Sequence, residues 1–219
     1  MSNQESENPT LPASKSPDGG PIDLESGSLA ASDAPNSPPI KPDPTGAAFF
    51  DIDNTVVQGA SIYAFGRGMV KNGIVSRREM ANFAWKQAKF VMAGTENMDD
   101  IAKIQDSALS IVKGRRVEEM QALADDVFDE YMADKLWEGT LALAHAHLDA
   151  GQRVWLVSAT PIEVAQVIAD RLGLTGAIGT RSEIKDGVYT GRLLGSPIHG
   201  QAKADAVATL AEVEGLDLT

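Results

Sequence analysis

The sequence contains no cysteine and only three histidines among its 219 residues. The absence of cysteine excludes disulfides, thiolate zinc sites and cysteine nucleophiles. Positive charge is also scarce, because 19 lysines and arginines are set against 31 acidic residues, for a formal net charge of −12. Contact with phosphate backbones depends on clustered Lys and Arg, so this balance argues against a nucleic-acid-binding protein.

Long apolar runs are missing as well. A membrane helix needs about 20 consecutive apolar residues, and no run approaches that length. The first residues lack the basic start and apolar core of a secretory signal. We therefore expect no membrane partner and a cytoplasmic location, while the sequence does not indicate the oligomeric state.

Residues 1–46 differ in composition from the rest of the chain. They hold nine of the eleven prolines and eight serines, and no aromatic residue. Such a segment cannot bury enough apolar surface to offset the entropy of ordering. The composition predicts a disordered tail, and an inert tail is favoured over a tethering or phosphorylated one.

Beyond the tail, strands are predicted to alternate with helices. The apolar residues 47–50 end at Asp51 and are typical of a strand buried on both faces. A second strand is expected over residues 153–158, and Asp186-Gly187 predicts a hairpin. This alternation predicts an α/β fold with a doubly wound, largely parallel sheet. Helices are expected over residues 138–150 and 201–214, and over a stretch in which Thr160 is the N-cap, Pro161 the first residue and Gly173 the end.

Three amphipathic helices are expected between the first two strands. Ser76 and Glu79 form a capping box ahead of a helix that ends at Gly94. A second helix ends at Gly114, and a third spans residues 117–131 with apolar residues three and four apart. The pattern predicts a helical bundle inserted after the first strand.

Two carboxylates follow the first strand directly, at Asp51 and Asp53. Ligands of an open α/β sheet gather at the carboxyl ends of its strands. One aspartate there can attack a phosphoryl group while the other moves the proton of the leaving group. On spacing alone, a polar strand end that merely forms a turn is an equally good interpretation.

Two further polar positions occur at helix starts. Ser158 ends the second strand, just before a predicted helix. A hydroxyl and free backbone N–H groups at such a position can bind a phosphate. An ordinary helix cap is the alternative interpretation. Lys203 begins the last helix and could neutralise a phosphoryl oxygen, although a lone lysine is more often a solvated charge.

The order of these elements resembles three successive motifs of the haloacid dehalogenase phosphatases. The likeness is greatest to the subfamily IB hydrolases, whose best-known members are phosphoserine phosphatases. It runs from Ala47 to the end of the chain. The residues that carry it are Asp51–Thr55, Gln58–Ser61, Ser158, Asp186–Gly191 and the glycine-preceded Lys203.

The resemblance implies a role for each motif residue. Asp51 would be the nucleophile, and Asp53 the general acid and base. Thr55 would order the first loop. Lys203 would balance the charge of Asp51 and phosphate. The phosphoryl oxygens would be held by Ser158 and the backbone at Ala159.

The resemblance also implies a cofactor, a domain plan and a reaction. Mg²⁺ would be bound by the Asp51 carboxylate and the Asp53 backbone carbonyl. Residues 47–59 and 136–219 would form the core and residues 60–135 a helical cap. The expected activity is Mg²⁺-dependent hydrolysis of a small phosphorylated metabolite through an aspartyl-phosphate.

Two departures from the family pattern leave other functions open. The family has a fourth, aspartate-bearing motif after a further strand, and Glu212, Glu214 and Asp217 do not fit it. The expectation is a chain that lacks a metal ligand and a core strand. Phosphoserine phosphatases also carry a glutamate where this chain has Gln58-Gly59-Ala60, so the sequence specifies the substrate only as a small phosphomonoester. An impaired remnant that binds a phosphorylated ligand is the main alternative, and a phosphotransferase is a third.

The remaining candidates favour structural interpretations. His145 and His147 are two positions apart on a predicted helix. They therefore face different sides of it and cannot bind one metal ion together. His199 is expected in a loop, and Arg115 and Arg116 in a solvated turn. The three tryptophans are predicted to be core residues: Trp85, Trp137 and Trp155.

Overall fold

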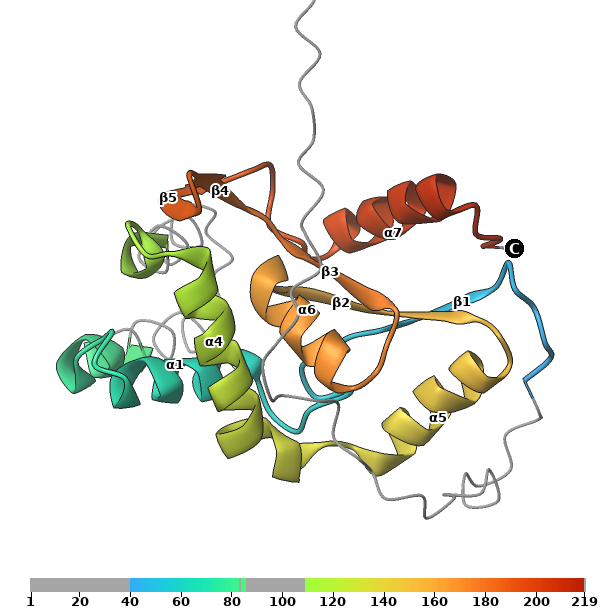
Figure 1. The fold of residues 1–219 in the computed structure, drawn as a ribbon, viewed down its shortest axis with the longest axis horizontal. Coiled ribbons are helices and arrows are strands. Elements are labelled where there is room, and N and C mark those ends of the chain that lie inside the picture. The colour runs from blue at the N-terminus through green and yellow to red at the C-terminus, as the bar shows by residue number, and fades with distance from the viewer. Residues whose placement is uncertain (1–39, 83, 86–108, 219) are drawn as a thin grey trace, which may run out of the picture.

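The computed structural model describes residues 40–82, 84–85 and 109–218, and Figure 1 shows their arrangement. Residues 77–82, 84–85 and 109–112 are also helical, on either side of a part of the chain that is not described. The elements, in chain order, are β1 (Ala47–Phe50), α1 (Ser61–Lys71), α4 (Val117–Val127), α5 (Glu138–Asp149), β2 (Arg153–Pro161), α6 (Ile162–Arg171), β3 (Gly176–Thr180), β4 (Ser182–Lys185), β5 (Val188–Leu193) and α7 (Gln201–Glu214).

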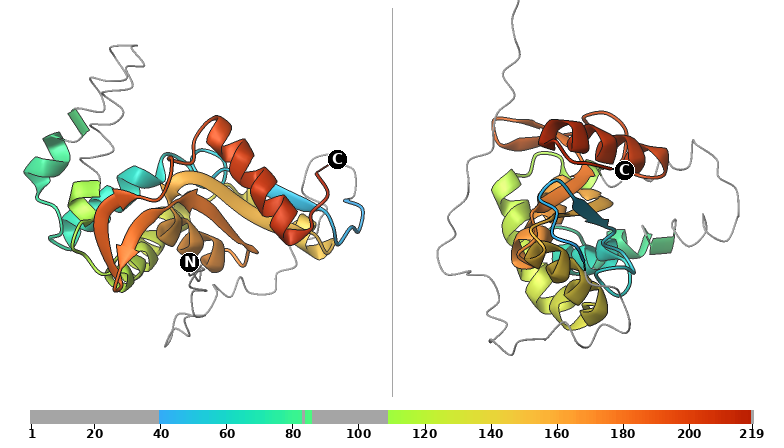
Figure 2. Two further views of the ribbon diagram at one scale, coloured as in Figure 1. Left: turned by 90° about the horizontal axis from the view of Figure 1, so that it is seen from above. Right: turned by 90° about the vertical axis from the view of Figure 1, so that its right-hand side faces the viewer.

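A three-stranded parallel sheet in the order β1-β2-β3 forms the centre of the molecule. Ala47 pairs with Arg153, and Leu156 pairs with Ala177. Helix α7 lies on one side of this sheet and α5 on the other (Figures 1 and 2). The predicted α/β fold with a parallel sheet is therefore confirmed.

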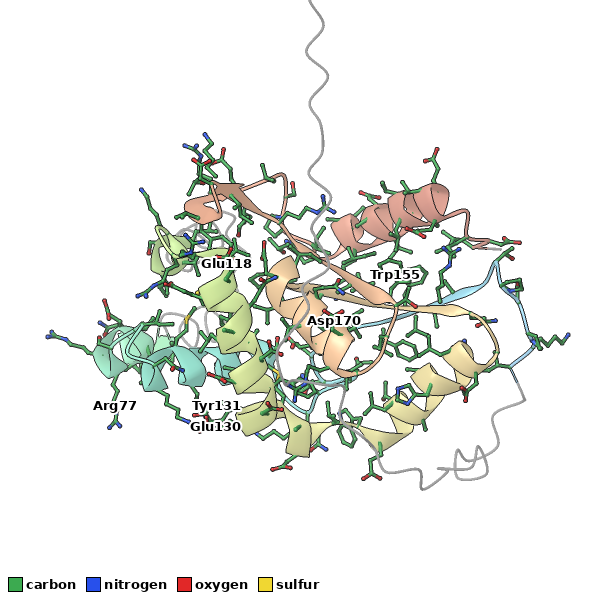
Figure 3. The ribbon with its side chains drawn as sticks, viewed as in Figure 1. Arg77, Glu118, Glu130, Tyr131, Trp155 and Asp170 are labelled. Atoms are coloured by element: carbon green, nitrogen blue, oxygen red, sulfur yellow. The ribbon has the colours of Figure 1, made fainter. Side chains whose placement is uncertain are left out.

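Strand β2 shows why the sheet needs helices on both faces. Val154, Leu156 and Ser158 are buried. Trp155 projects from the other face and lies between β2 and α7 (Figure 3). Arg153, on the same face, pairs with Glu214 of α7 at 2.7 Å. Since successive side chains of a strand alternate, β2 holds the core with one face and α7 with the other.

The inserted helices lie beyond the carboxyl ends of the strands (Figure 1). α1 packs on α4, and α4 packs on α6. A short π-helix, Phe128–Met132, and a 3-10 turn, Ala133–Lys135, lead from α4 back to the sheet. The two connections to the insertion are joined, because Gln58 N–H donates to Lys135 O at 2.7 Å and Trp137 N–H donates to Val56 O at 2.9 Å.

Several local predictions are confirmed. Glu79 accepts from Ser76 N–H at 2.8 Å and donates its own N–H to Ser76 Oγ at 3.2 Å, as a capping box requires. Asp186 and Gly187 have φ of 52° and 74° between the paired strands β4 and β5. The predicted helix end at Gly94, and the start of the helix that ends at Gly114, lie outside the described residues.

Three predictions are wrong or incomplete. Thr160 and Pro161 do not start α6 but extend β2. The Thr160 hydroxyl bonds with Ser158 of the same strand and does not cap the helix. Strand β3 was not expected. Trp85 and Trp137 are 74% and 48% exposed, so they are not core residues.

The end of the predicted tail contacts the core. Asp43 N–H donates to Ala150 O at 3.3 Å, and Asp217 N–H donates to Thr45 O at 3.0 Å. Residues 1–39 of that tail lie outside the described residues. Within the described ranges, no helix is both long and apolar enough to cross a membrane.

Candidate active site

Asp51 is the first residue after β1, and its carboxylate is held from two directions. Oδ1 accepts the N–H of Ile52 at 2.9 Å, and Oδ2 lies 2.8 Å from Lys203 Nζ. Ile52 is fully buried, which anchors the loop in the core, while the Asp51 side chain remains 45% exposed. The arrangement gives a carboxylate that is neutralised yet accessible.

Asp53 is held by the start of the next helix. Its Oδ1 accepts the N–H of Ser61, the first residue of α1, at 2.8 Å. The intervening turn is closed by Asn54, whose Oδ1 accepts from Gly59 N–H at 3.0 Å. Asn54 has φ of 57°, a left-handed conformation that asparagine tolerates better than most residues. Thr55 lies in the same turn and donates its N–H to Ile52 O at 3.4 Å.

A chain of hydroxyl groups joins this loop to the end of β2. Ser158 Oγ donates to Thr160 Oγ1 at 2.9 Å, and Thr160 Oγ1 lies 3.0 Å from Ser61 Oγ. Ser158 and Ser61 are each only 2% exposed. Ala159, between Ser158 and Thr160, is exposed, and its carbonyl accepts the hydroxyl of Thr180 at 2.8 Å. Sequence reasoning singled out Ser158 and Ala159 but missed this role of Thr160 and Ser61.

Lys203 reaches Asp51 from the first turn of α7. That helix begins after Gly200, which has φ of 53°, a conformation that favours glycine. A lysine next to a helix N-terminus adds a full charge to the partial positive charge of the helix end. The predicted residues Asp51 and Lys203 are thus in direct contact, and the predicted residues Asp53 and Ser158 are connected through Ser61 and Thr160.

The first turn of α6 carries a buried carboxyl group that sequence analysis did not single out. Glu163 is 8% exposed and lies close to Tyr189 of β5, and its Oε2 is buried without a hydrogen-bond partner among the described residues. Burial raises the pKa of Glu163 above its ordinary value. Burial, together with the nearby Glu163, raises the pKa of Tyr189 far above its ordinary value. The pair joins the hairpin to α6.

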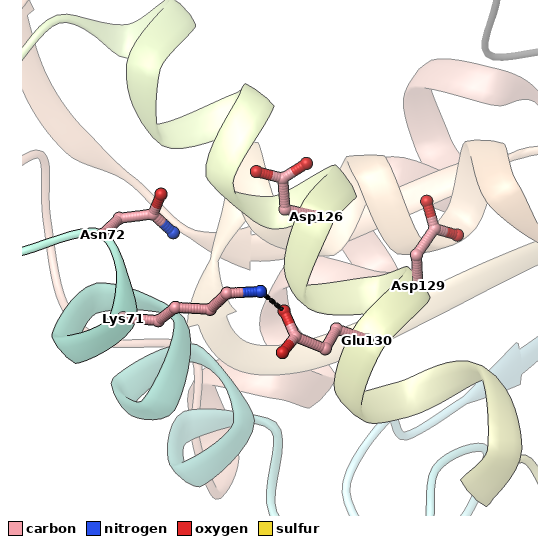
Figure 4. Close-up of a pocket in the computed structure, with 5 residues that line it drawn as sticks. All are labelled: Lys71, Asn72, Asp126, Asp129 and Glu130. Carbon is pink, nitrogen blue, oxygen red and sulfur yellow. Dashed lines mark hydrogen bonds and ion pairs between the residues drawn. The ribbon is translucent and has the colours of Figure 1, made fainter.

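A pocket away from this loop does not suit a phosphate. It has a volume of about 370 Å³ and lies between α1 and the end of α4 (Figure 4). Its single cation, Lys71, is paired with Glu130. The acidic excess of this lining would repel a phosphate. The residues that line it are Lys71, Asn72, Asp126, Asp129 and Glu130.

Residues 48–219 match the model of the haloacid dehalogenase-like hydrolases. The chain belongs to this family. It is 50% identical over 198 residues to the phosphoserine phosphatase SerB1 of Mycobacterium tuberculosis. The match covers 90% of this chain and 63% of that protein, so the chain spans less than two thirds of this relative's length.

Solved structures agree on the fold. A Bordetella pertussis Tohama I protein of unknown function is 24% identical with a TM-score of 0.67, over 80% of this chain and 78% of that one. A phosphoserine phosphatase solved as a phospho-aspartyl intermediate analogue is 20% identical with a TM-score of 0.52, over 80% of this chain and 74% of that one.

Two oxygen donors near the end of β1 could bind the Mg²⁺ that the family resemblance implies. Asp51 offers a carboxylate and Asp53 a backbone carbonyl, the kind of ligand that Mg²⁺ prefers. Among the described residues, no group of three acidic or histidine side chains is placed to hold a metal ion. Glu214 is paired with Arg153 instead. The two donors fit Mg²⁺ in kind but are too few to complete an octahedral shell.

The other candidates take structural roles. His145 Nε2 lies 3.1 Å from Leu172 O, and His147 Nδ1 lies 2.5 Å from Gln152 Oε1. His199 is exposed in the loop before α7. Arg115 is half-buried and donates to Ile74 O at 3.4 Å, whereas Arg116 is exposed and pairs with the exposed Glu118 at 3.2 Å.

Proposed function

We propose that this haloacid dehalogenase-like hydrolase is a phosphomonoesterase in which Asp51 is the nucleophile. The observation that carries the proposal is the Asp51 carboxylate, fixed by Ile52 N–H and by Lys203 Nζ at 2.8 Å, with Asp53 two residues further along. A fixed, partly exposed carboxylate beside a cation can approach a phosphate ester without prohibitive charge repulsion.

The reaction consists of two in-line displacements at phosphorus. An Asp51 oxygen forms a bond to phosphorus while the bond from phosphorus to the ester oxygen breaks. Asp53 gives its proton to the departing alkoxide. Asp53 then accepts a proton from water, whose oxygen attacks phosphorus, breaks the bond to Asp51 and releases inorganic phosphate. Asp53 suits both steps because one of its oxygens is held by Ser61 N–H while the other is left for the proton.

The phosphoryl oxygens are assigned to Lys203 and to the end of β2. Lys203 supplies a full positive charge, and the first turn of α6, which begins at Ile162, supplies N–H groups at a helix N-terminus. Phosphoryl transfer depends chiefly on this kind of positioning and charge stabilisation.

We expect Mg²⁺ to be required, with the Asp51 carboxylate and the Asp53 carbonyl as two of its ligands. When bound, the cation would neutralise charge on the transferring phosphoryl group. Its remaining ligands would be water, a phosphate oxygen or residues outside the described ranges.

The substrate class that we propose is a small phosphorylated metabolite of the cytoplasm. The likeness to SerB1 supports a phosphoserine-like compound. The segment Gln58-Gly59-Ala60 has no acidic residue that could bind the amino group of phosphoserine. We therefore propose a phosphomonoester without specifying the alcohol. We further propose that residues 60–135 act as a cap over the site, since the inserted helices lie beyond the carboxyl ends of the strands (Figure 1).

Hydrolysis of p-nitrophenyl phosphate by the full-length protein in the presence of Mg²⁺ tests the proposal. Asp51→Asn keeps the size of the side chain and removes its charge, so we expect activity to fall to the level of buffer. Asp149→Asn, at the exposed end of α5, is the matched control and should leave activity unchanged. Full activity in Asp51→Asn would show that another residue is the nucleophile.

A second candidate function is a remnant that binds a phosphorylated ligand without turnover. It is favoured by the small number of acidic side chains around Asp51 within the described residues. Calorimetry with Mg²⁺ and beryllium fluoride, a mimic of the phospho-aspartate, separates the two. Joint binding without hydrolysis would support the remnant.

A further inference from the structure

The hydroxyl of Thr160 lies between the loop that carries Asp53 and the phosphate-binding end of β2. We propose that Thr160, acting through Ser61, positions the Asp53 carboxyl group for proton transfer. The inference rests on the proposed function and adds to it a positioning residue that lies outside the motif residues.

The connection is continuous from β2 to Asp53. Thr160 Oγ1 accepts from Ser158 Oγ at 2.9 Å and lies 3.0 Å from Ser61 Oγ. Ser61 N–H then donates to Asp53 Oδ1 at 2.8 Å. Ser61 thus uses its hydroxyl on the β2 side and its backbone on the Asp53 side, so any shift of Ser61 is passed directly to the carboxyl group.

Burial makes this connection stiff. Ser61 and Ser158 are each 2% exposed, so water cannot easily replace the bonds between the hydroxyl groups. A hydrogen bond in such surroundings is electrostatically stronger than in water, and an unpaired hydroxyl is costly. The start of α1 is consequently held at a fixed distance from the end of β2.

Thr160 is itself anchored in the sheet. Its N–H donates to Ser158 Oγ at 3.1 Å. The carbonyl of the preceding residue, Ala159, accepts the hydroxyl of Thr180 on β3 at 2.8 Å, and Thr180 Oγ1 also accepts from Ile198 N–H at 3.1 Å. The hydrogen bond of the Thr160 hydroxyl therefore fixes the start of α1 relative to the sheet. Asp53, in contrast, belongs to a partly exposed turn.

The chemical consequence concerns the leaving group. A poor leaving group such as an alkoxide needs a well-placed proton, whereas p-nitrophenolate leaves readily without one. Loss of the Thr160 hydroxyl should therefore slow hydrolysis of an alkyl phosphate much more than hydrolysis of p-nitrophenyl phosphate. A general loss of structure would slow both equally.

The test compares kcat/KM on both esters, because kcat/KM reports the step in which the alcohol leaves. Thr160→Val removes the hydroxyl at nearly constant volume and should lower kcat/KM about 10- to 100-fold on the alkyl ester and only a few-fold on the aryl ester. Thr160→Ser restores a hydroxyl and should restore the wild-type ratio. Thr209→Val, on the exposed face of α7, is the matched control.

A second variant guards against misfolding of Thr160→Val. Ser61→Ala removes the hydroxyl but keeps the N–H that Asp53 accepts, and it should give the same ester-dependent loss. Equal losses on both esters, or no loss, would overturn the positioning role while Asp51→Asn remains inactive. Hydrolysis that survives in Asp51→Asn would instead overturn the proposed function.

Discussion

Lys203 Nζ lies 2.8 Å from Asp51 Oδ2 although the two residues come from opposite ends of the described chain. Both side chains are partly exposed, at 29% and 45%. Exposed ion pairs of this kind contribute about 0–1 kcal/mol to stability. The pair therefore contributes little to the stability of the fold, and under the proposed function its importance lies in the charge that it places beside Asp51.

Replacement of Lys203 separates these two effects. Lys203→Met keeps most of the apolar stem and removes the charge, so we expect kcat/KM to fall by roughly 10²–10³-fold, because a group that stabilises transition-state charge is lost. The free energy of unfolding should change by less than about 1 kcal/mol. Steady-state kinetics and urea denaturation measure the two quantities, and a large loss of stability with intact kinetics would contradict the assignment.

Replacement of Ser61 by proline tests the other half of the site. Ser61 is the first residue of α1, where proline is tolerated, and the preceding Ala60 is extended, with φ of −106° and ψ of 126°. The proline ring would occupy the space of the N–H that Asp53 accepts. We expect kcat/KM on an alkyl phosphate to fall by about 10²-fold. The free energy of unfolding should fall by about 1–3 kcal/mol, because Thr160 loses its Ser61 hydroxyl partner as well. Glu138→Pro, at the first residue of α5, is the matched control and should retain activity.

Any side chain at Gly68 is predicted to lower stability, because α1 and α4 approach each other closely there. A Cβ atom at Gly68 would lie 2.2 Å from Val127 Cγ2. Gly68→Ala should lower the free energy of unfolding by about 1–3 kcal/mol, despite the better helix propensity of alanine.

Two matched variants sharpen this test of helix packing. Adding Val127→Ala to Gly68→Ala should recover part of the loss, because the clashing methyl group is removed. Gly139→Ala in α5, where a Cβ would meet nothing within 4 Å, should be neutral or slightly stabilising. Thermal or urea unfolding gives the free energy of unfolding of each variant. If the losses of stability caused by Gly68→Ala and Val127→Ala simply add in the double variant, the two residues do not clash.

Glu163 should make stability depend on pH. Burial raises its pKa in the folded protein, so the folded state keeps the proton at a pH where the unfolded chain has lost it. The contribution of Glu163 to stability is therefore complete below the unfolded pKa of about 4.3 and falls as the pH rises towards the folded pKa. Glu163→Gln cannot ionise, and its stability relative to the wild type should increase from pH 4 to pH 7. Unfolding midpoints across that range would show a constant difference if Glu163 were not buried.

Local signals predicted the elements that depend on neighbouring residues alone. The capping box at Ser76 and Glu79 and the turn at Asp186-Gly187 need no knowledge of the fold. Strand β3 was missed because glycine weakens a strand signal and Gly179 serves packing. A Cβ there would lie 2.7 Å from Ile162 Cα, so glycine allows β3 to approach the start of α6.

Tertiary contacts decided the rest. The spacing of Asp51 and Asp53 drew attention to a loop that Lys203 and Ser61 contact in the structure. The hydrogen bond between Ser61 and Thr160, in contrast, joins residues 99 positions apart and has no local signature. A hydroxyl at each of Ser61, Ser158 and Thr160 is the only trace that it leaves in the sequence. Similarly, residue type alone suggested that Trp85 and Trp137 are buried, whereas exposure depends on what packs against them.

The parallel pairing of β1 with β2 also dictates when the site can form. Ala47 pairs with Arg153, so this contact closes a loop of more than 100 residues that contains all the inserted helices. Helices form from local contacts within microseconds, whereas a contact so distant in sequence has a high entropic cost and forms late. During refolding, helical circular dichroism should therefore return before the ability to bind a phosphate mimic. Asp51 and its surroundings come together only when the two strands pair, so binding of a phosphate mimic would measure the last step of folding.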